Sequence, residues 1–240
     1  MTIRVGTSGF SYKEWKKIFY PADLPNDRFL SYYATRFGAV EIDSTFYRMP
    51  TPKSLETWAE ATPENFRFAI KASQRITHRE RLAIPSDALR FMLGLLGRLE
   101  AKLGVVLYQL PPFFRRDDAR LEAFLAALPE SPKSALEFRH VSWFADETFQ
   151  MLEKYGTALC INDNDEFECP KELTAKHTYV RLRRDSYSPE ERDAWKERMR
   201  AFAARGVEVF AFVKHKDNPD APLIALDFAA GIDGDAAPIS

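Results

Sequence analysis

The feature that most constrains this chain is a regular alternation of two kinds of segment. Short runs of β-branched or apolar residues are separated by longer stretches with apolar residues at helical spacing. This alternation predicts a parallel sheet, because parallel neighbours need a long crossover connection and a helix is the usual one. The runs are Ile3–Thr7, Val40–Asp43, Arg67–Lys71, Val105–Leu110, Ala135–Arg139, Ala158–Asn162, Thr178–Leu182 and Glu208–Val213.

Eight strands without a break in composition predict closure into a (β/α)8 TIM-type barrel. We therefore expect residues 1–240 to form a single barrel domain. Between Asn162 and Thr178 there is room only for a loop and a turn, so the helix between strands 6 and 7 is expected to be short or missing.

The helical segments open on residues that favour helix N-termini. Gly156 and Gly206 stand just before predicted strands, where a glycine commonly ends the preceding helix. The expected helix starts are Asn26-Asp27, Thr51-Pro52, Ser86-Asp87, Asp117-Asp118, Asp146 and Ser188-Pro189.

Side-chain alternation along the strands predicts a polar pocket. Successive side chains of a strand face opposite ways, and here one face is apolar while the other becomes polar toward the C-terminal end. The apolar faces must pack against the helices, so the polar side chains point into the barrel, at the end where barrels place their ligand sites. These side chains are Glu41, Asp43, Lys71, Gln109, Glu137, Arg139, Asn162, Arg181 and Lys214.

The cations slightly outnumber the carboxylates in this set, which favours a small anionic ligand such as a phosphate or carboxylate. The alternative is a structural ion-pair network that fills the barrel interior. In that case Arg139 and Arg181 form salt bridges with Glu41 and Glu137. The two carboxylates then stay ionised and cannot serve as general acids. Both interpretations stay open at this point.

Composition limits the partners and the compartment. The 34 basic and 35 acidic residues give a net charge of −1, so nucleic acid is a possible partner but not the favoured one. The two cysteines, Cys160 and Cys169, lack C-x-x-C spacing and fit a reducing cytoplasm. No apolar run approaches the roughly 18 residues of a membrane span, and ordered pattern begins at Ile3, so we expect no signal peptide and no membrane partner. The oligomeric state is left open.

Distinctive motifs run along nearly the whole chain. They are Gly6-Thr-Ser-Gly9-Phe-Ser-Tyr12-Lys-Glu-Trp15, Phe19-Tyr20-Pro21, Glu41-Ile-Asp-Ser-Thr45-Phe46-Tyr47-Arg48, Ile76-Thr77-His78, Gln109-Leu-Pro111-Pro112-Phe113, Glu137-Phe-Arg139-His140-Val-Ser-Trp143 and Tyr179-Val-Arg181-Leu182. Together these motifs resemble those of the YecE-like family of proteins of unknown function. The resemblance implies a TIM-type barrel of cytosolic bacterial and archaeal proteins, and it supplies no established reaction.

The chain departs from the family pattern at two places. Many relatives read Arg-Leu-His-Gly where this chain has Arg181-Leu-Arg183-Arg184. Many also end the last strand with paired asparagines, where this chain has Lys214-His215. Both departures add positive charge at the expected site.

Glu41 and Glu137 are the candidate catalytic pair, because two carboxylates facing each other across a barrel mouth can act as general acid and base. The favoured function is an enzyme, with hydrolysis preferred, that acts on an anionic substrate. One alternative is a glycosidase-like hydrolase that uses the same carboxylates. The other is a non-catalytic protein that binds nucleic acid or another ligand.

Further candidates surround this pair. Ser8, between Gly6 and Gly9, lies in a loop whose backbone amides can approach an anion. No serine has the His–Asp partners of a nucleophile, and the four histidines lack metal-ligand spacing. No cofactor and no metal ligand are therefore predicted, although a weak magnesium site is not excluded. Aromatic side chains expected to contact substrate at the rim are Tyr12, Trp15 and Trp143.

Overall fold

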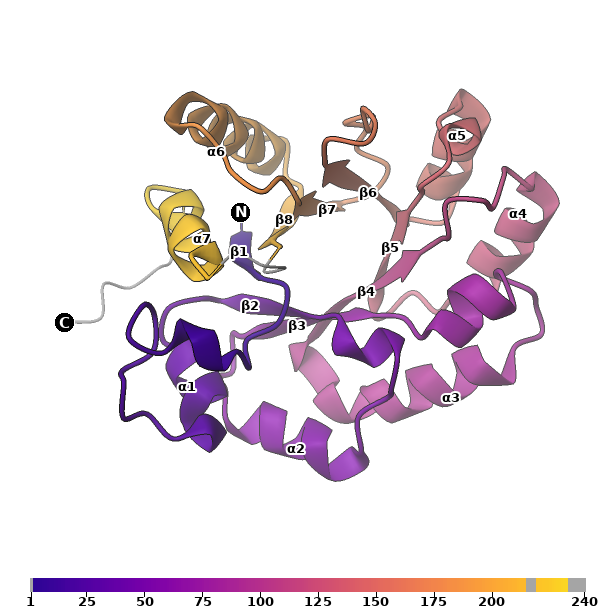
Figure 1. The fold of residues 1–240 in the computed structure, drawn as a ribbon. Helices are drawn as coiled ribbons and strands as arrows, with labels where there is room; N and C mark the ends of the chain where they lie inside the picture. The colour runs from indigo at the N-terminus through magenta and orange to yellow at the C-terminus, as the bar shows by residue number, and fades with distance from the viewer. Residues whose placement is uncertain (1, 215–218, 233–240) are drawn as a thin grey trace.

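The computed structural model describes residues 2–214 and 219–232. Its eight strands form one parallel sheet in the order β1-β8-β7-β6-β5-β4-β3-β2, which curves into a nearly closed barrel (Figure 1). The predicted (β/α)8 architecture is confirmed. The strands are β1 (Ile3–Thr7), β2 (Ala39–Ile42), β3 (Arg67–Lys71), β4 (Leu103–Gln109), β5 (Lys133–Glu137), β6 (Ala158–Asp163), β7 (His177–Leu182) and β8 (Glu208–Val213).

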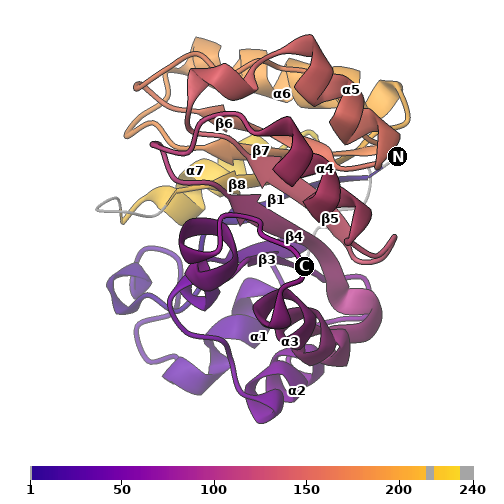
Figure 2. The same ribbon diagram turned by 90° about the vertical axis from the view of Figure 1, so that its right-hand side faces the viewer.

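The helices lie around the outside of the strands (Figures 1 and 2). No helix in the described ranges is long and apolar enough to cross a membrane. The α-helices are α1 (Phe29–Tyr33), α2 (Pro52–Glu60), α3 (Asp87–Leu96), α4 (Asp118–Ala126), α5 (Asp146–Lys154), α6 (Pro189–Ala204) and α7 (Ala221–Ala229). A π-helix covers Arg75–Arg79, and short 3-10 segments cover Lys13–Trp15, Asn26–Arg28, Ser44–Phe46, Gly97–Lys102 and Val141–Trp143.

Most of the expected helix starts are capped as the sequence predicted. The side chains of Thr51, Ser86 and Asp117 each accept a hydrogen bond from a backbone amide of the first helical turn. Ser188 forms a reciprocal capping box with Glu191 at the start of α6. Among the described residues no helix connects β6 to β7, which confirms the missing crossover helix.

A buried tyrosine completes the barrel between β1 and β2, which are joined by a single bridge at Ser8 and Glu41. The hydroxyl of Tyr33 accepts a hydrogen bond from the amide of Thr7 (2.8 Å) and lies 3.2 Å from the carbonyl oxygen of Ala39. It therefore links the two strands where their ladder is missing. A Cβ atom at Gly6 would collide with that same carbonyl oxygen, so only glycine permits the strands to approach this closely.

The two faces of each strand separate into two cores, as the alternation predicted. The outward faces pack with the helices in one large apolar cluster that includes Val40, Phe68 and Val209. The inward faces form a second cluster, which fills the barrel. Its residues are Ala39, Ala69, Val105, Leu107, Ala135, Ala158, Cys160, Tyr179, Phe210 and Phe212. Above this apolar filling, at the C-terminal ends of the strands, lie the polar side chains.

Candidate functional site

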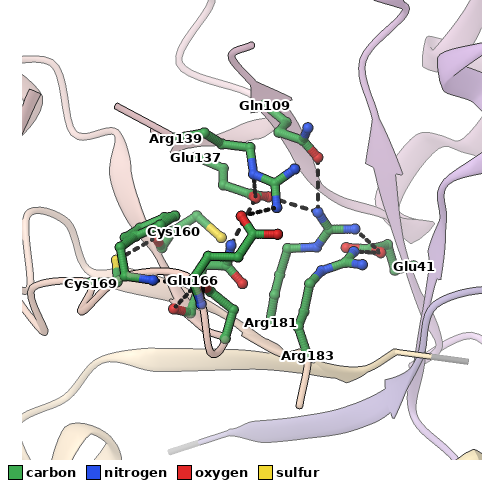
Figure 3. Close-up of polar contacts among 12 residues, drawn as sticks. Glu41, Gln109, Glu137, Arg139, Cys160, Glu166, Cys169, Arg181 and Arg183 are labelled. Atoms are coloured by element: carbon green, nitrogen blue, oxygen red, sulfur yellow. Dashed lines mark hydrogen bonds and ion pairs between the residues drawn. The ribbon is translucent and has the colours of Figure 1, made fainter. Parts of the chain in front are cut away.

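A buried arginine joins the polar side chains from opposite sides of the barrel. Arg181 on β7 donates to Glu41 of β2 and to Glu137 of β5, each at 2.7 Å, and to Gln109 of β4 at 3.1 Å. Glu41 and Glu137 are 0% exposed and Arg181 is 1% exposed. Figure 3 shows the guanidinium between the two carboxylates. The predicted convergence of these side chains is therefore present, and its centre is sealed from solvent.

Neighbouring side chains satisfy the remaining oxygens of the two glutamates. Glu41 also accepts hydrogen bonds from the Ser8 hydroxyl (2.5 Å) and the Tyr179 hydroxyl (2.6 Å). The Asn162 amide donates to Glu137 at 3.1 Å. Buried charges are tolerated when they are paired and hydrogen-bonded in this way. We call Glu41, Glu137 and Arg181, with their partners Ser8, Gln109, Asn162 and Tyr179, the inner layer.

A second set of charged side chains lies above the inner layer and is partly exposed. The side chains of Arg139 and Arg183 are 26% and 20% exposed, and each has a guanidinium nitrogen 3.6 Å from a buried glutamate. These contacts are too long for hydrogen bonds, so the guanidinium groups keep free donors. Lys214 is 24% exposed and lies 3.7 Å from the exposed Asp185. We call the outer layer Asp43, Lys71, His78, Arg139, Arg183 and Lys214.

Three half-buried groups of the outer layer have shifted pKa values. Burial, followed by the charge of Glu41, raises the pKa of Asp43. Burial, followed by the charge of Arg181, lowers the pKa of Lys71. Burial and then the charges of Lys71 and Arg139 lower the pKa of His78. Because the charge of Lys71 acts on both Asp43 and His78, the three groups share one neighbourhood, and clustered pKa shifts of this kind are a mark of functional sites.

Phe46 connects Lys71 to His78. The Lys71 ammonium lies 4.2 Å from the centre of the Phe46 ring, and the His78 ring meets the same ring edge-on at 4.8 Å. Thr45 donates to the carbonyls of Ile42 and Lys71 and thereby fixes the end of β2 against the end of β3. The chain therefore holds Lys71 and His78 side by side at this part of the mouth.

Three buried polar atoms at the mouth have no hydrogen-bond partner in the described part of the chain. They are Nε of Arg139, Oδ1 of Asn162 and Nε of Arg181. An unsatisfied buried polar group costs about 1–3 kcal/mol, so such atoms are rare in folded proteins. Their gathering around Glu137 fits a place where a ligand supplies both a donor and an acceptor.

A pocket of about 430 Å³ opens beside this cluster. It lies between β6, the β6–β7 loop and α6, and its lining includes Asn162, Asp163, Glu166, Arg184 and Trp195. Asn162 therefore belongs both to the inner layer and to the pocket wall.

The structure does not bring all predicted site residues to the mouth. Trp15 and Trp143 are 0% exposed, so they cannot contact a ligand there. The Trp143 indole donates to the Phe114 carbonyl at 2.7 Å and its ring stacks on Phe138, so it packs a loop against the barrel. Tyr12 is half-buried, and its hydroxyl donates to the Ser8 carbonyl at 2.9 Å. His215 lies outside the described residues.

Two residues of the outer layer were absent from the predicted site. His78 belongs to the Ile76-Thr77-His78 motif, but that motif follows β3 on the π-helix, which the sequence did not reveal. π-helical turns frequently occur at functional sites, and this turn places the His78 ring against Phe46, the ring that Lys71 also contacts. The sequence identifies Arg183 as an added positive charge at the expected site, but the predicted set of ligand-binding residues omits it. Its position two residues beyond Arg181, on the same inward face, is the signal that could have identified it.

A metal centre was not predicted from the sequence. Within residues 2–214 and 219–232, no group of three or more His, Cys, Asp and Glu side chains is close enough to hold a metal ion. The buried carboxylates of Glu41 and Glu137 are both bound to the Arg181 guanidinium.

Comparison with protein families identifies one family model that matches almost the whole chain and curated relatives that match part of it. The family model described as protein of unknown function DUF72 matches residues 4–238. The UPF0759 protein YunF of Bacillus subtilis is 32% identical over 148 residues, which are 58% of this chain and 52% of that protein. The UPF0759 protein YecE of Escherichia coli K12 is 30% identical over 144 residues, 60% of this chain and 50% of that protein. The matched regions thus span about half the length of these curated relatives.

Solved structures agree with the fold. A DUF72 family protein from Thermotoga maritima superposes with a TM-score of 0.85 at 27% identity, covering 95% of this chain and 98% of that one. A D-psicose 3-epimerase from Clostridium cellulolyticum, solved with D-tagatose, gives a TM-score of 0.53 at 11% identity, covering 98% and 94%. The second likeness shows the barrel fold alone.

Proposed function

The chain belongs to the DUF72 family of proteins of unknown function, and from the geometry of its barrel mouth we propose that it is an enzyme. It binds a small anionic substrate at the C-terminal ends of the strands and moves a proton on that substrate. The observation that carries the proposal is the outer layer. There Asp43, Lys71 and His78, whose pKa values are shifted chiefly by burial, lie among cations that retain free donors.

The cations of the outer layer hold the anion. Arg139 and Arg183 are anchored at long range by buried glutamates, so their positions are fixed while their remaining N–H groups are available. A guanidinium can grip a phosphate or carboxylate with two parallel hydrogen bonds. Lys214 adds a third cation, whose contact with Asp185 is long and exposed and is therefore easily exchanged for a ligand.

The proton moves through the half-buried groups. A lowered pKa makes the Lys71 amine available as a general base nearer neutral pH than an ordinary lysine. A raised pKa makes Asp43 a better general acid than an ordinary aspartate. Burial, followed by the charges of Lys71 and Arg139, lowers the pKa of His78, which favours the neutral imidazole, and His78 can relay the proton.

Glu41 and Glu137, predicted from the sequence as acid and base, take a positioning role in this proposal. Both carboxylates are buried beneath Arg181 and each is bonded to it. A general acid or base must reach the proton that it transfers. The same argument weighs against the glycosidase-like alternative, which needs two carboxyl groups that flank a sugar.

Calorimetric titration with inorganic phosphate tests the anion site, and it is run in buffers of different ionisation enthalpy. A bound anion favours the charged forms of Lys71 and His78, so we expect proton uptake and an observed heat that varies with the buffer. The double variant Arg139→Gln/Arg183→Gln should weaken binding at least tenfold. The matched control Arg90→Gln, an exposed arginine on α3, should bind like the parent protein.

Two results would overturn this proposal. One is an absence of binding by phosphate, sulfate and malonate at millimolar concentration. The other is phosphate affinity that is equal in the parent protein and the Arg139/Arg183 double variant. Once a screen of phosphorylated and carboxylated metabolites identifies a substrate, Lys71→Met should abolish turnover while substrate still binds.

Nucleic-acid binding stays a second prediction, and the outer rim of the mouth bears on it. Tyr47 after β2 and Phe113 after β4 are 78% and 67% exposed, and exposed aromatic rings can stack on bases. Arg48 and Arg115 are exposed in the same two loops, and Arg79 is exposed on the π-helix after β3. Fluorescence anisotropy with a labelled single-stranded oligonucleotide would detect such binding. Affinity that does not fall with added salt would exclude an electrostatic mode.

A further inference from the structure

We infer that the pocket between β6, the β6–β7 loop and α6 is a second subsite, which receives a protonated amino group of the substrate. The inference rests on the proposed anion site and narrows its substrate class. The substrate then carries a phosphate or carboxylate for the outer-layer cations and, a short linker away, an ammonium group. Asn162 is the residue that joins the two subsites.

The first argument is the unpartnered acceptor of Asn162. Asn162 is 1% exposed, and its amide nitrogen is fixed by donation to Glu137 at 3.1 Å. Its Oδ1 is thereby left as the free end, without a hydrogen-bond partner among the described residues. Asn162 is also one of the residues that line the pocket, and we therefore place its unpartnered oxygen within reach of a donor group bound there, which would satisfy it.

The second argument is the charge of the pocket lining. Four carboxylates line it, from Asp163, Asp165, Glu166 and Glu168, against the cations of Lys171 and Arg184. Both cations already have carboxylate partners: Arg184 pairs with Asp163 at 3.1 Å, and Lys171 lies 3.8 Å from Glu168. A hydroxyl and an ammonium group could both donate a hydrogen bond to the Asn162 oxygen. The excess negative charge of the pocket lining favours the ammonium group.

The third argument is the contact between the two subsites. The Asn162 amide and the Nε atom of Arg139 approach the same oxygen of Glu137, at 3.1 Å and 3.6 Å. Glu166 of the pocket lining reaches toward Arg139 from the β6–β7 loop, 3.7 Å from its guanidinium, as Figure 3 shows. The anion-binding and amine-binding groups are therefore adjacent, so the substrate that we infer has a short linker between its two charges.

Three phosphates of nearly equal size separate the contributions of the two subsites. They are O-phosphoethanolamine, 2-hydroxyethyl phosphate and ethyl phosphate, which end in an ammonium, a hydroxyl and a methyl group. We expect O-phosphoethanolamine to bind at least tenfold more tightly than ethyl phosphate, with 2-hydroxyethyl phosphate closer to ethyl phosphate. Calorimetry with the full chain measures all three.

Variants assign this preference to the pocket. Asn162→Ala removes the buried acceptor and should reduce the preference for the ammonium probe. Because this change also takes a partner from Glu137, a second variant leaves the barrel interior intact: Asp165→Asn/Glu166→Gln, at two exposed loop carboxylates. It should reduce the same preference several-fold. Glu172→Gln, in the same loop but outside the pocket lining, should leave it unchanged.

The outcomes separate the inference from the function on which it rests. If all three phosphates bind with equal affinity, the amine subsite is refuted while the anion site stands. The amine subsite is likewise refuted if 2-hydroxyethyl phosphate binds as tightly as O-phosphoethanolamine, or if the loop double variant keeps the full preference. If none of the three binds at millimolar concentration, the anion site itself fails.

Discussion

The inner and outer layers of the barrel mouth contain the same kinds of side chain in opposite states. In the inner layer Arg181 lies between Glu41 and Glu137 at hydrogen-bond distance from both, and solvent is excluded. In the outer layer Arg139 and Arg183 approach these same glutamates only to 3.6 Å and remain partly exposed. Buried charges that pair directly form a structural frame, whereas partly exposed charges with long contacts remain free to bind a ligand.

The difference shows why charge alone does not identify a site. Each layer has arginine beside glutamate, and both lie at the C-terminal ends of strands. In a buried ion pair, each charge offsets the desolvation cost of the other. Its members therefore have mainly a structural role. The partly exposed cations lose little when a ligand replaces their long contacts. The following predictions test this division, beginning with the largest expected effect.

Arg181→Met should cause the largest loss of stability. It leaves two buried glutamates without their shared cation, and breaking a buried pair in this way typically costs about 3–5 kcal/mol. Urea unfolding followed by circular dichroism measures the loss. A cost below about 1 kcal/mol would mean that the inner layer is no structural frame.

The outer-layer counterpart, Arg139→Gln/Arg183→Gln, should change the free energy of unfolding by less than about 1 kcal/mol, as partly exposed ion pairs generally do. The same urea experiment therefore compares the change in the free energy of unfolding for the Arg181 variant with that for the Arg139/Arg183 variant. Losses of equal size in the two layers would abolish the distinction between them.

Lys71→Met should alter how stability depends on pH. The pKa of Lys71 is lowered in the folded state, so the native protein holds its proton less tightly than the unfolded chain. The parent protein consequently gains stability as pH rises from the folded pKa toward the unfolded value of 10.5. The methionine variant lacks this gain, so any stability advantage that it has at neutral pH should shrink in alkaline solution. Thermal unfolding across that range shows the trend, and an advantage that grows with pH would contradict it.

Asp43→Asn should give the smallest effect, with the opposite sign of slope. The pKa of Asp43 is raised in the folded state, so the parent protein loses stability as pH rises above 3.8 through the folded pKa. The asparagine variant does not titrate and should gain on the parent protein over that interval. Thermal unfolding in acidic buffers measures this difference; a relative loss for the variant would show that Asp43 is stabilised as a carboxylate.

The strand pattern made most of the fold predictable. Each predicted strand overlaps the observed one, and three, including Ile3–Thr7, have the predicted bounds. Helix α7 was missed because its segment is apolar on nearly all sides. The side chain of its N-cap residue, Asp220, makes no capping hydrogen bond. It therefore lacks the amphipathic stripe and the start signal that revealed α6.

The candidate site was predictable as a set of residues but less so as a set of contacts. The inward face of each strand follows from alternation, which correctly placed Arg181 and Glu137 inside the barrel. Trp15 and Trp143 were expected at the rim because they follow strands in loops. Those loops fold back on the barrel and bury both rings. A loop position in the sequence does not reveal which way the loop turns.

The sequence by itself determined which side chains enter the barrel, because the two-residue period of a strand is a local property. Only the tertiary structure decided which of the charged groups cancel. Arg181 meets Glu41 across 140 positions of the chain, and Tyr33 closes the gap between β1 and β2. Such pairings depend on how the curved sheet brings distant strands together. A local sequence pattern does not reveal which residues far apart in the chain will come into contact.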